Sequence, residues 1–197
     1  LESTMYEGHL YTLPDSFNAG SMFYSTALFE KAGLARPGSD WTMDPFRSSA
    51  ASIAKVGGGT YAFDWVVRLW GSWTSFLYAN DGNLLEEGRY SGGDWLWNSK
   101  AFADNAVGVS GRKGGWKWGD PTANSDAAVE ALQYVIDLQK SGASPSPDVG
   151  GGATLQGLMA SGRIGMTIGG GFWAGGLHNA GMKDGSFDVV EFPTWKS

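Results

Sequence analysis

The sequence predicts an α/β domain in which helices flank a mixed, partly parallel sheet. Segments with apolar residues at helical spacing alternate along the chain with short β-like runs. Two of these runs, residues 8–14 (GHLYTLP) and 187–193 (FDVVEFP), each end at a proline, which cannot donate to a β-ladder and so marks where a strand leaves its sheet. We therefore expect one folding unit bracketed by two strands that lie side by side.

Helices are predicted where apolar spacing coincides with end signals. The strongest pattern covers residues 126–141, where Asn124 or Ser125 can cap the first turn and Gly142 follows the last. Its expected buried stripe consists of Val129, Leu132, Val135, Ile136 and Leu138. The other helices are expected over residues 25–32, 44–56 with Thr42 as its cap, 72–78, 154–161 and 172–180.

Two further strands are predicted between these helices. Residues 60–65 (TYAFDW) place Tyr61 and Phe63 in alternation with small or polar residues, which is typical of a half-buried strand. Residues 163–168 (RIGMTI) form the second strand and lead into a run of glycines. The interleaving of strands with helices is what favours a sheet with parallel pairs.

An irregular insertion is expected at residues 86–123, which have weak periodicity and many glycines. Trp95 and Trp97 stand two residues apart, as do Trp116 and Trp118. Two short strands in a hairpin would place both pairs on one face, because side chains two apart in a strand point the same way. Such a face would offer aromatic edges to a long glycan or to a protein partner.

Composition excludes several classes of function. The net charge of -6 and the pI near 4.8 argue against a nucleic-acid partner, because phosphate binding needs clustered cations and the cluster here is limited to Arg112, Lys113 and Lys117. The absence of cysteine excludes disulfides and thiolate chemistry. We also expect no membrane-spanning segment, and no secretory leader precedes Leu1.

Several segments together resemble a known family. In chain order they are MFYSTALFEKAGL, DWTMDPF, FLYANDGNLL, NSDAAVEALQYVIDLQKSG and LMASGRIGMTIGGGFWAG. This series, with the runs at residues 8–14 and 187–193, resembles the extracellular solute-binding proteins of ABC importers, the large sugar-binding family that includes maltose-binding protein. The likeness leaves out most of residues 91–122, and Ser25 stands where the family usually has asparagine.

The resemblance implies one lobe of a two-lobe periplasmic-binding-protein-like fold of type II. Residues 1–14 would hold the first hinge crossover with a remnant of the N-terminal lobe, residues 15–186 the body of the C-terminal lobe, and residues 187–197 the second crossover. An N-terminal lobe would precede Leu1 and a further stretch would follow Ser197. The implied function is capture of a sugar or oligosaccharide, without a cofactor, for the membrane permease of an ABC importer. The implied location is periplasmic or extracellular, with a lipid anchor if the source is a Gram-positive bacterium.

A sugar site needs flat aromatic platforms for C–H faces and oriented hydrogen-bond partners for hydroxyls. The family places aromatic contacts on the approach to the third helix and after the glycine run. In this sequence, polar residues also follow the first crossover or interrupt a strand. The candidate aromatic residues are Trp73, Trp173, Trp70 and Phe172. The candidate polar residues are Asp64, Asp15, Asn18 and Arg68. Core packing remains the alternative for the rings, and caps, turns or surface charges for the polar groups.

Enzymatic functions find little support in the sequence. A glycosidase needs two carboxylates across a cleft, and no spacing singles out a pair among Asp64, Glu86, Glu87 and Glu191. The two histidines, His9 and His178, are far apart and lack a metal-ligand spacing. A stand-alone glycan-binding module or glycoside hydrolase is the alternative. If the chain is one lobe, it exposes apolar surface and is expected to self-associate.

Overall fold

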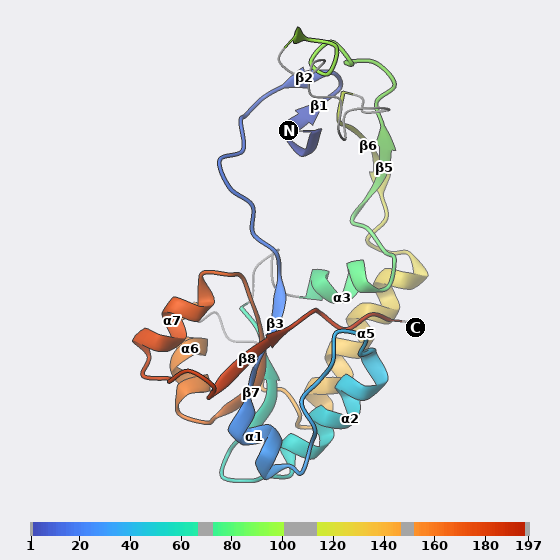
Figure 1. Cartoon of the computed structure of the whole chain (residues 1–197). Coiled ribbons are helices and arrows are strands. Elements are labelled where there is room, and N and C mark those ends of the chain that lie inside the picture. Colours follow the sequence, from blue (N-terminus) through green and yellow to red (C-terminus); the bar gives the residue numbers. More distant parts are fainter. Residues whose placement is uncertain (1, 67–72, 101–113, 147–151, 196–197) are drawn as a thin grey trace. The chain divides into compact units, whose positions relative to one another are not determined.

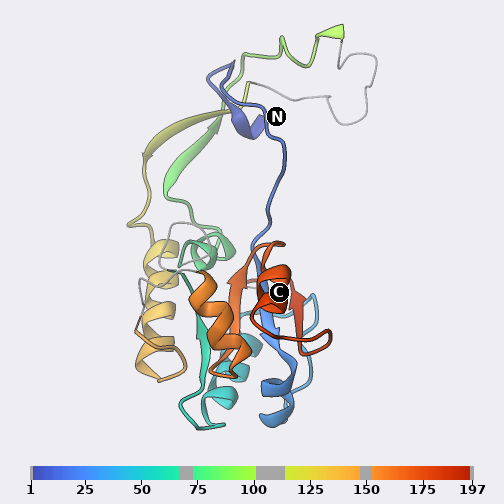
Figure 2. The same cartoon turned by 90° about the vertical axis from the view of Figure 1, so that its left-hand side faces the viewer.

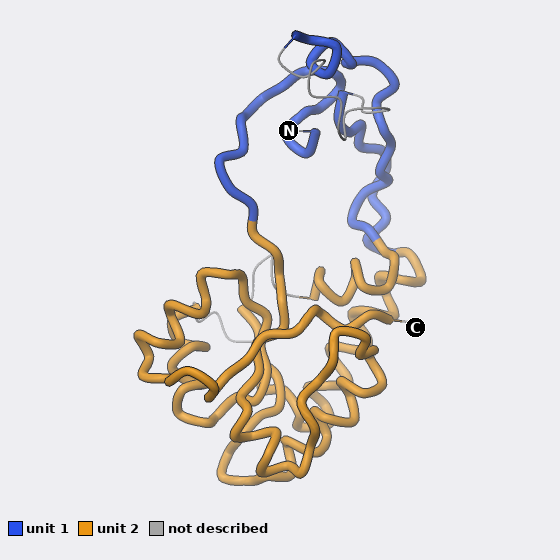
Figure 3. The backbone as a smooth tube through the Cα atoms, viewed as in Figure 1, with its two compact units in different colours: residues 1–17, 83–124 blue, residues 18–82, 125–197 orange. Residues whose placement is uncertain are grey.

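The computed structural model describes residues 2–66, 73–100, 114–146 and 152–195 of the chain. The chain divides into two compact units, unit 1 (Leu1–Phe17 and Asn83–Asn124) and unit 2 (Asn18–Gly82 and Ser125–Ser197) (Figure 3). The sequence prediction placed the first boundary after Pro14 and the insertion at residues 86–123. In the part of the chain that the structure describes, no helix is both long and apolar enough to cross a membrane.

Unit 2 contains a four-stranded mixed sheet, as predicted. Its strands are β4 (Tyr61–Asp64), β7 (Ile164–Gly169), β3 (Ser21–Ser25) and β8 (Phe187–Val190), in that spatial order (Figure 1). β4 and β7 are parallel, whereas β3 runs antiparallel to both of its neighbours. Every residue of β7 is buried, as expected for a central strand that is covered on both faces.

Six helices of unit 2 cover this sheet. They are α1 (Thr26–Lys31), α2 (Met43–Ala54), α3 (Trp73–Ala79), α5 (Asp126–Lys140), α6 (Gly152–Ala160) and α7 (Trp173–Asn179). Figures 1 and 2 show α6 and α7 on one face of the sheet and α2, α3 and α5 on the other. Each predicted helix is present with its bounds shifted by a few residues, and the predicted α/β class is confirmed.

Two apolar cores fill the spaces between these layers. Under α6 and α7, Phe23 of β3 packs with Trp173 and with Leu155 and Met159 of α6. On the other face, an aromatic cluster joins α2, β4, α3 and α5. Its ring centroids lie 5.4 Å apart for Phe46 and Phe63, 5.7 Å for Phe63 and Phe76, and 5.5 Å for Phe76 and Tyr134. Edge-to-face pairs of this kind stabilise beyond their buried area.

The buried stripe predicted for the helix at residues 126–141 is wrong in part. Val129 and Leu132 are 58% and 45% exposed, respectively. The residues of α5 that face the core are Ala128, Ala131, Tyr134, Val135 and Leu138. Apolar residues occupy most of the circumference of this helix, and the inward face is selected by the Tyr134 hydroxyl, which donates to the carbonyl of Met43 at 2.9 Å.

The second of the two proline-ended runs pairs with a segment that was not predicted as a strand. β8 pairs with β3, in which Met22 lies opposite Val190 and Ser25 opposite Phe187. In residues 8–14, strand structure is limited to β2 (His9–Leu10), which belongs to unit 1. The sequence predicted no strand at β3 and began a helix at Ser25. Met22 to Ser25 are buried in succession, which is typical of a central strand that is covered on both faces.

Unit 1 contains a second sheet. Its elements are the 3₁₀ helix η1 (Glu2–Thr4) and the strands β1 (Met5–Tyr6), β2, β5 (Leu85–Arg89) and β6 (Trp116–Pro121), with strand order β2-β1-β6-β5. β5 and β6 form an antiparallel pair. The predicted hairpin is wrong in part. Its second strand, with Trp116 and Trp118, is β6, but β6 pairs with β5, and Trp95 and Trp97 lie in a turn-rich stretch after β5.

Candidate functional site

The direction of the strands in unit 2 gives its sheet two chemically different edges. β4 is parallel to β7, and β7 and β8 are both antiparallel to the β3 strand between them, so β4, β7 and β8 all end at the same edge. We call this end of the sheet, where the three strands finish, the carboxyl edge. β3 begins there, with Ser21 opposite Gly169. Open α/β sheets bind ligands outside the carboxyl ends of their strands, so this edge is the place to look for a site.

A glycine loop forms the centre of the carboxyl edge. A Cβ atom on Gly169 would lie 2.5 Å from Cγ of Trp173, and one on Gly170 would lie 2.3 Å from the side-chain amide of Asn18. A side chain on Gly169 would clash with a buried ring, whereas one on Gly170 would displace the end of the flexible Asn18 side chain. The Gly171 N–H donates to Oδ1 of Asn18 at 3.1 Å. The segment that leads into β3 is thereby joined to the loop that follows β7.

The two aromatic residues after this loop have opposite environments. Phe172 is the N-cap residue of α7 and is 59% exposed. Trp173 is 0% exposed, and its ring centroid lies 6.0 Å from that of Phe23 in the core. Its buried indole nitrogen has no hydrogen-bond partner among the described residues. Of these two rings, that of Phe172 is therefore accessible at the carboxyl edge. Trp173 packs against the loop from the core side.

The remaining candidates in unit 2 lie at the ends of β4 and α3. Asp64, the last residue of β4, is 4% exposed, and its Oδ1 accepts the N–H of Trp65 at 2.8 Å. Its side chain also lines a cavity of about 450 Å³ beside Tyr61 and Arg163. Trp73 is half-buried and begins α3, which lies at the same end of unit 2 as the start of β3 (Figures 1 and 2).

The described structure does not test three of the candidates at this edge. Trp70 and Arg68 lie outside the described residues. Asp15 belongs to unit 1, is exposed, and accepts a hydrogen bond from Oγ of Ser16 at 3.1 Å. Within unit 2 the structure therefore joins Asn18 to the glycine loop directly before Phe172. It leaves the roles of the other candidates as predictions.

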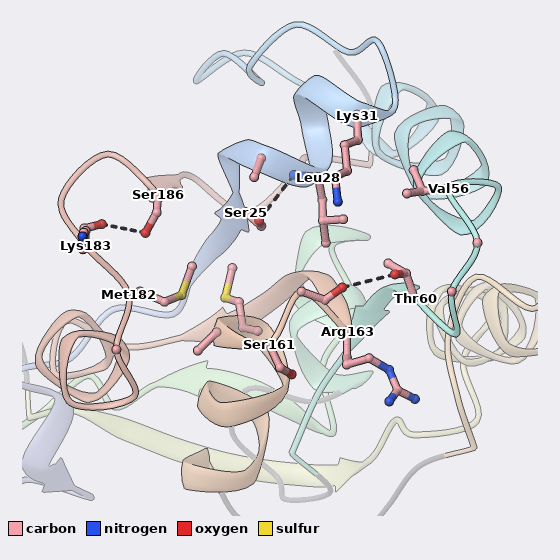
Figure 4. A pocket seen from close by; sticks show the side chains of 17 residues that line it. Ser25, Leu28, Lys31, Val56, Thr60, Ser161, Arg163, Met182, Lys183 and Ser186 are labelled. Carbon is pink, nitrogen blue, oxygen red and sulfur yellow. Dashed lines mark hydrogen bonds between the residues drawn. The ribbon is translucent and has the colours of Figure 1, made fainter.

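A hollow at the opposite edge was not foreseen from the sequence. It has a volume of about 600 Å³ and lies where β4, β7 and β8 begin (Figure 4). Lys31, Arg163 and Lys183 line it, and among its described lining residues none is Asp or Glu. The guanidinium of Arg163 is already bound to the carbonyl of Gly59 at 2.9 Å. Lys31 ends α1, Arg163 directly precedes β7 and Lys183 lies shortly before β8, so no sequence motif could have revealed this cluster.

Metal chemistry finds no support in the described parts of the chain, where no group of three or more His, Asp or Glu side chains could hold an ion. The carboxyl edge instead offers an exposed ring, a close-approach glycine loop and an amide that is fixed by the backbone. This combination suits binding of a neutral, hydroxylated ligand better than a chemical step.

The sequence profile of the family described as bacterial extracellular solute-binding protein matches residues 4–196. The chain belongs to this family. Over 63 residues, 32% of this chain, it is 38% identical to a putative binding protein of Brucella abortus (strain 2308), of which the match covers 15%. The family consists of extracellular binding proteins, which confirms the family indicated by the sequence.

Two solved structures share the fold. An ABC transporter solute-binding protein from Thermotoga lettingae, bound with α-D-tagatose, has a TM-score of 0.71 at 22% identity, with 98% of this chain and 43% of that chain covered. An ABC substrate-binding protein from Listeria monocytogenes, in complex with cycloalternan, has a TM-score of 0.67 at 21% identity, with 99% and 45% covered. The chain thus spans less than half the length of either. The type II binding-protein fold is confirmed.

Proposed function

We propose that this chain supplies one face of a sugar-binding site in a solute-binding protein that serves an ABC importer. The observation that carries the proposal is the exposed ring of Phe172 at the carboxyl edge, directly after the glycine loop. Sugars present apolar C–H faces that pack on flat rings and hydroxyls that need hydrogen-bond partners. The solved relatives bound with tagatose and with cycloalternan support this class of ligand.

Phe172 is the platform in this proposal. Backbone groups of the glycine loop come close to the ligand because no Cβ atom projects from Gly170 or Gly171. Asn18 holds the loop through the N–H of Gly171 and keeps an amide N–H₂ that can donate to a hydroxyl. Trp73, Trp70, Asp64 and Arg68 remain candidate contacts of the same site, and Trp173 acts by supporting the loop.

The further steps are those of a binding protein. The ligand is held without covalent chemistry, and it is passed to a membrane permease outside the cytoplasm, with a lipid anchor retaining the protein at the surface in a Gram-positive host. Hinge closure around a ligand is the known mode of periplasmic binding proteins. A single face of such a site should bind weakly, because well-formed pockets enclose about 70–90% of a ligand.

Calorimetric titration with maltose, tagatose and cyclic glucans tests the proposal. We expect binding of at least one sugar with a dissociation constant near ~1 mM, and loss of most of that affinity in Phe172→Ala. Tyr11→Ala, which removes an exposed ring in unit 1, is the matched control and should bind as the parent does. Equal binding by the Phe172→Ala variant would overturn the proposal. Release of reducing sugar by the chain would instead support the hydrolase alternative.

A further inference from the structure

A stacked pair of tryptophan rings lies on the second strand of the β5–β6 hairpin in unit 1. The rings of Trp116 and Trp118 are stacked, with centroids 5.7 Å apart and planes 10° from parallel. The guanidinium carbon of Arg89 lies 4.0 Å from the centroid of Trp116, and Arg89 also forms an ion pair with Glu2 at 2.6 Å. Trp116 is therefore held between neighbours, and Trp118 is the end of the stack.

Trp118 has one ring face available for a ligand. Its other face is covered by Trp116, and the side chain as a whole is 42% exposed. The stack fixes the orientation of the ring, so a ligand that packs on it would lose little additional side-chain entropy. Trp95, although 54% exposed, differs because its indole N–H donates to the carbonyl of Gly8 at 2.9 Å and it has no ring stacked on it among the described residues.

A carboxylate borders the same face of the hairpin. Glu87 lies directly opposite Trp118 in the β5–β6 register, and cross-strand neighbours of this kind have Cβ atoms about 4.5–5.5 Å apart. The register shifts directly beyond this pair, between Leu85 and Glu87, so the alternation of side chains does not extend to the last residues of β6. Glu87 is exposed and can accept two or more hydrogen bonds from the hydroxyls of a ligand that covers the ring.

This arrangement selects among classes of ligand. An anion is disfavoured because the Glu87 carboxylate lies beside the ring. An organic cation is bound best by a cage of several aromatic faces, whereas here one face is open. A neutral sugar fits, because its C–H face can lie on the indole while its hydroxyls donate to Glu87. We propose that the hairpin face centred on Trp118 is a second sugar-binding site, separate from Phe172.

The choice of a sugar as the ligand rests on the proposed function, whereas the site itself rests on the geometry of the hairpin. The two can be tested apart by following the indole N–H signals of the whole chain, labelled with ¹⁵N-tryptophan, during titration with maltose. Trp118 is assigned from the signal that disappears in Trp118→Phe. We expect its signal, and that of the stacked Trp116 assigned in the same way from Trp116→Phe, to shift progressively with maltose. Trp118→Ala should lower the affinity read from the Trp116 signal at least about tenfold.

Two variants serve as controls. Lys117→Ala alters the opposite face of the same strand and should leave the Trp118 shift unchanged. Phe172→Ala removes the ring of the first site and should also leave the Trp118 shift unchanged. Circular dichroism of Trp118→Ala checks that the hairpin is retained, and the conservative Trp118→Phe variant should keep part of the affinity.

Three outcomes overturn the second site. No shift of Trp118 with maltose means that the stack is only structural. A shift that Phe172→Ala abolishes means that Trp118 reports the first site at a distance. A larger shift with choline than with maltose means that the face binds cations. If Phe172→Ala has no effect on any sugar binding while Trp118 responds, the first site fails and the hairpin site stands.

Discussion

Replacing Trp173 or its neighbour Phe172 by alanine should have opposite consequences. Trp173 is fully buried against Phe23 and beneath Gly169, so Trp173→Ala should destabilise unit 2. Phe172 is mostly exposed, so Phe172→Ala should weaken sugar binding and leave stability nearly unchanged. Two adjacent aromatic residues would thus separate folding from function.

The magnitude follows from burial. Truncating a buried Trp or Phe to alanine typically costs about 3–5 kcal/mol, and a domain is stable by only about 5–15 kcal/mol in total. Trp173→Ala should therefore remove a large fraction of the free energy of unfolding. Exposed substitutions usually change stability by less than about 0.5 kcal/mol, which is the limit expected for Phe172→Ala.

Urea unfolding followed by circular dichroism measures the difference. With a slope of about 2 kcal/mol per molar urea, a loss of about 4 kcal/mol lowers the midpoint by about 2 M. Trp173→Phe is the intermediate variant. It keeps a ring in the core and removes the unpartnered indole N–H, whose burial costs about 1–3 kcal/mol, so its midpoint should lie close to that of the parent chain.

The reasoning would be refuted by the reverse pattern. If Trp173→Ala kept the parent midpoint but lost sugar binding, the indole would be a ligand contact and the buried arrangement would not describe the chain in solution. A large drop in the midpoint for Phe172→Ala would equally contradict its exposed placement.

Three further predictions concern unit 2. Burial raises the pKa of Tyr134 from 10.0 to about 12, with Arg47 opposing the shift. The native state then keeps a proton that the unfolded chain loses, so stability is full below pH 10 and should fall by about 2 kcal/mol as the pH rises toward 12. Gly170→Ala should displace the Asn18 amide and lower sugar affinity about tenfold in calorimetry. The exposed Val129 and Leu132 should promote self-association, detected by light scattering, which their double replacement by lysine should abolish.

Controls make these three decisive. Tyr134→Phe should lose the alkaline decline in stability, and an equal decline in that variant would assign the effect to another group. Asn18→Ala should reduce the effect of Gly170→Ala in a double-mutant cycle, because the clashing partner is gone. A strictly monomeric parent chain at high concentration would contradict the third prediction.

Much of the fold could be predicted because local and long-range preferences agree. Ser25 and Ser125 cap α1 and α5 by accepting the N–H of Leu28 and Ala128, both at 3.4 Å, and such caps are visible in sequence. The face of α5 was not predictable, because apolar residues surround the helix and tertiary contacts select which ones are buried. β3 was missed for a related reason: a short strand buried on both faces has no alternation.

The sequence indicated the region of the candidate site but not which side chains are exposed or bonded there. The glycine run and the two rings after it identified the loop at the carboxyl edge. Which ring is exposed was decided by Gly169, whose missing side chain admits the indole of Trp173. The pairing of Asn18 with Gly171 joins residues 153 positions apart. No local pattern indicates such a pair.

Because β3 runs antiparallel to its two neighbours, the segment before β3 belongs to the candidate site. Because β3 enters the sheet at the carboxyl edge, Asn18 arrives beside the glycine loop with its amide bonded to Gly171. Pulling this segment away would stretch or break that bond, and moving the loop would pull on the segment. A ligand that stiffens the glycine loop should therefore also restrain the segment before β3, through which the polypeptide enters unit 2.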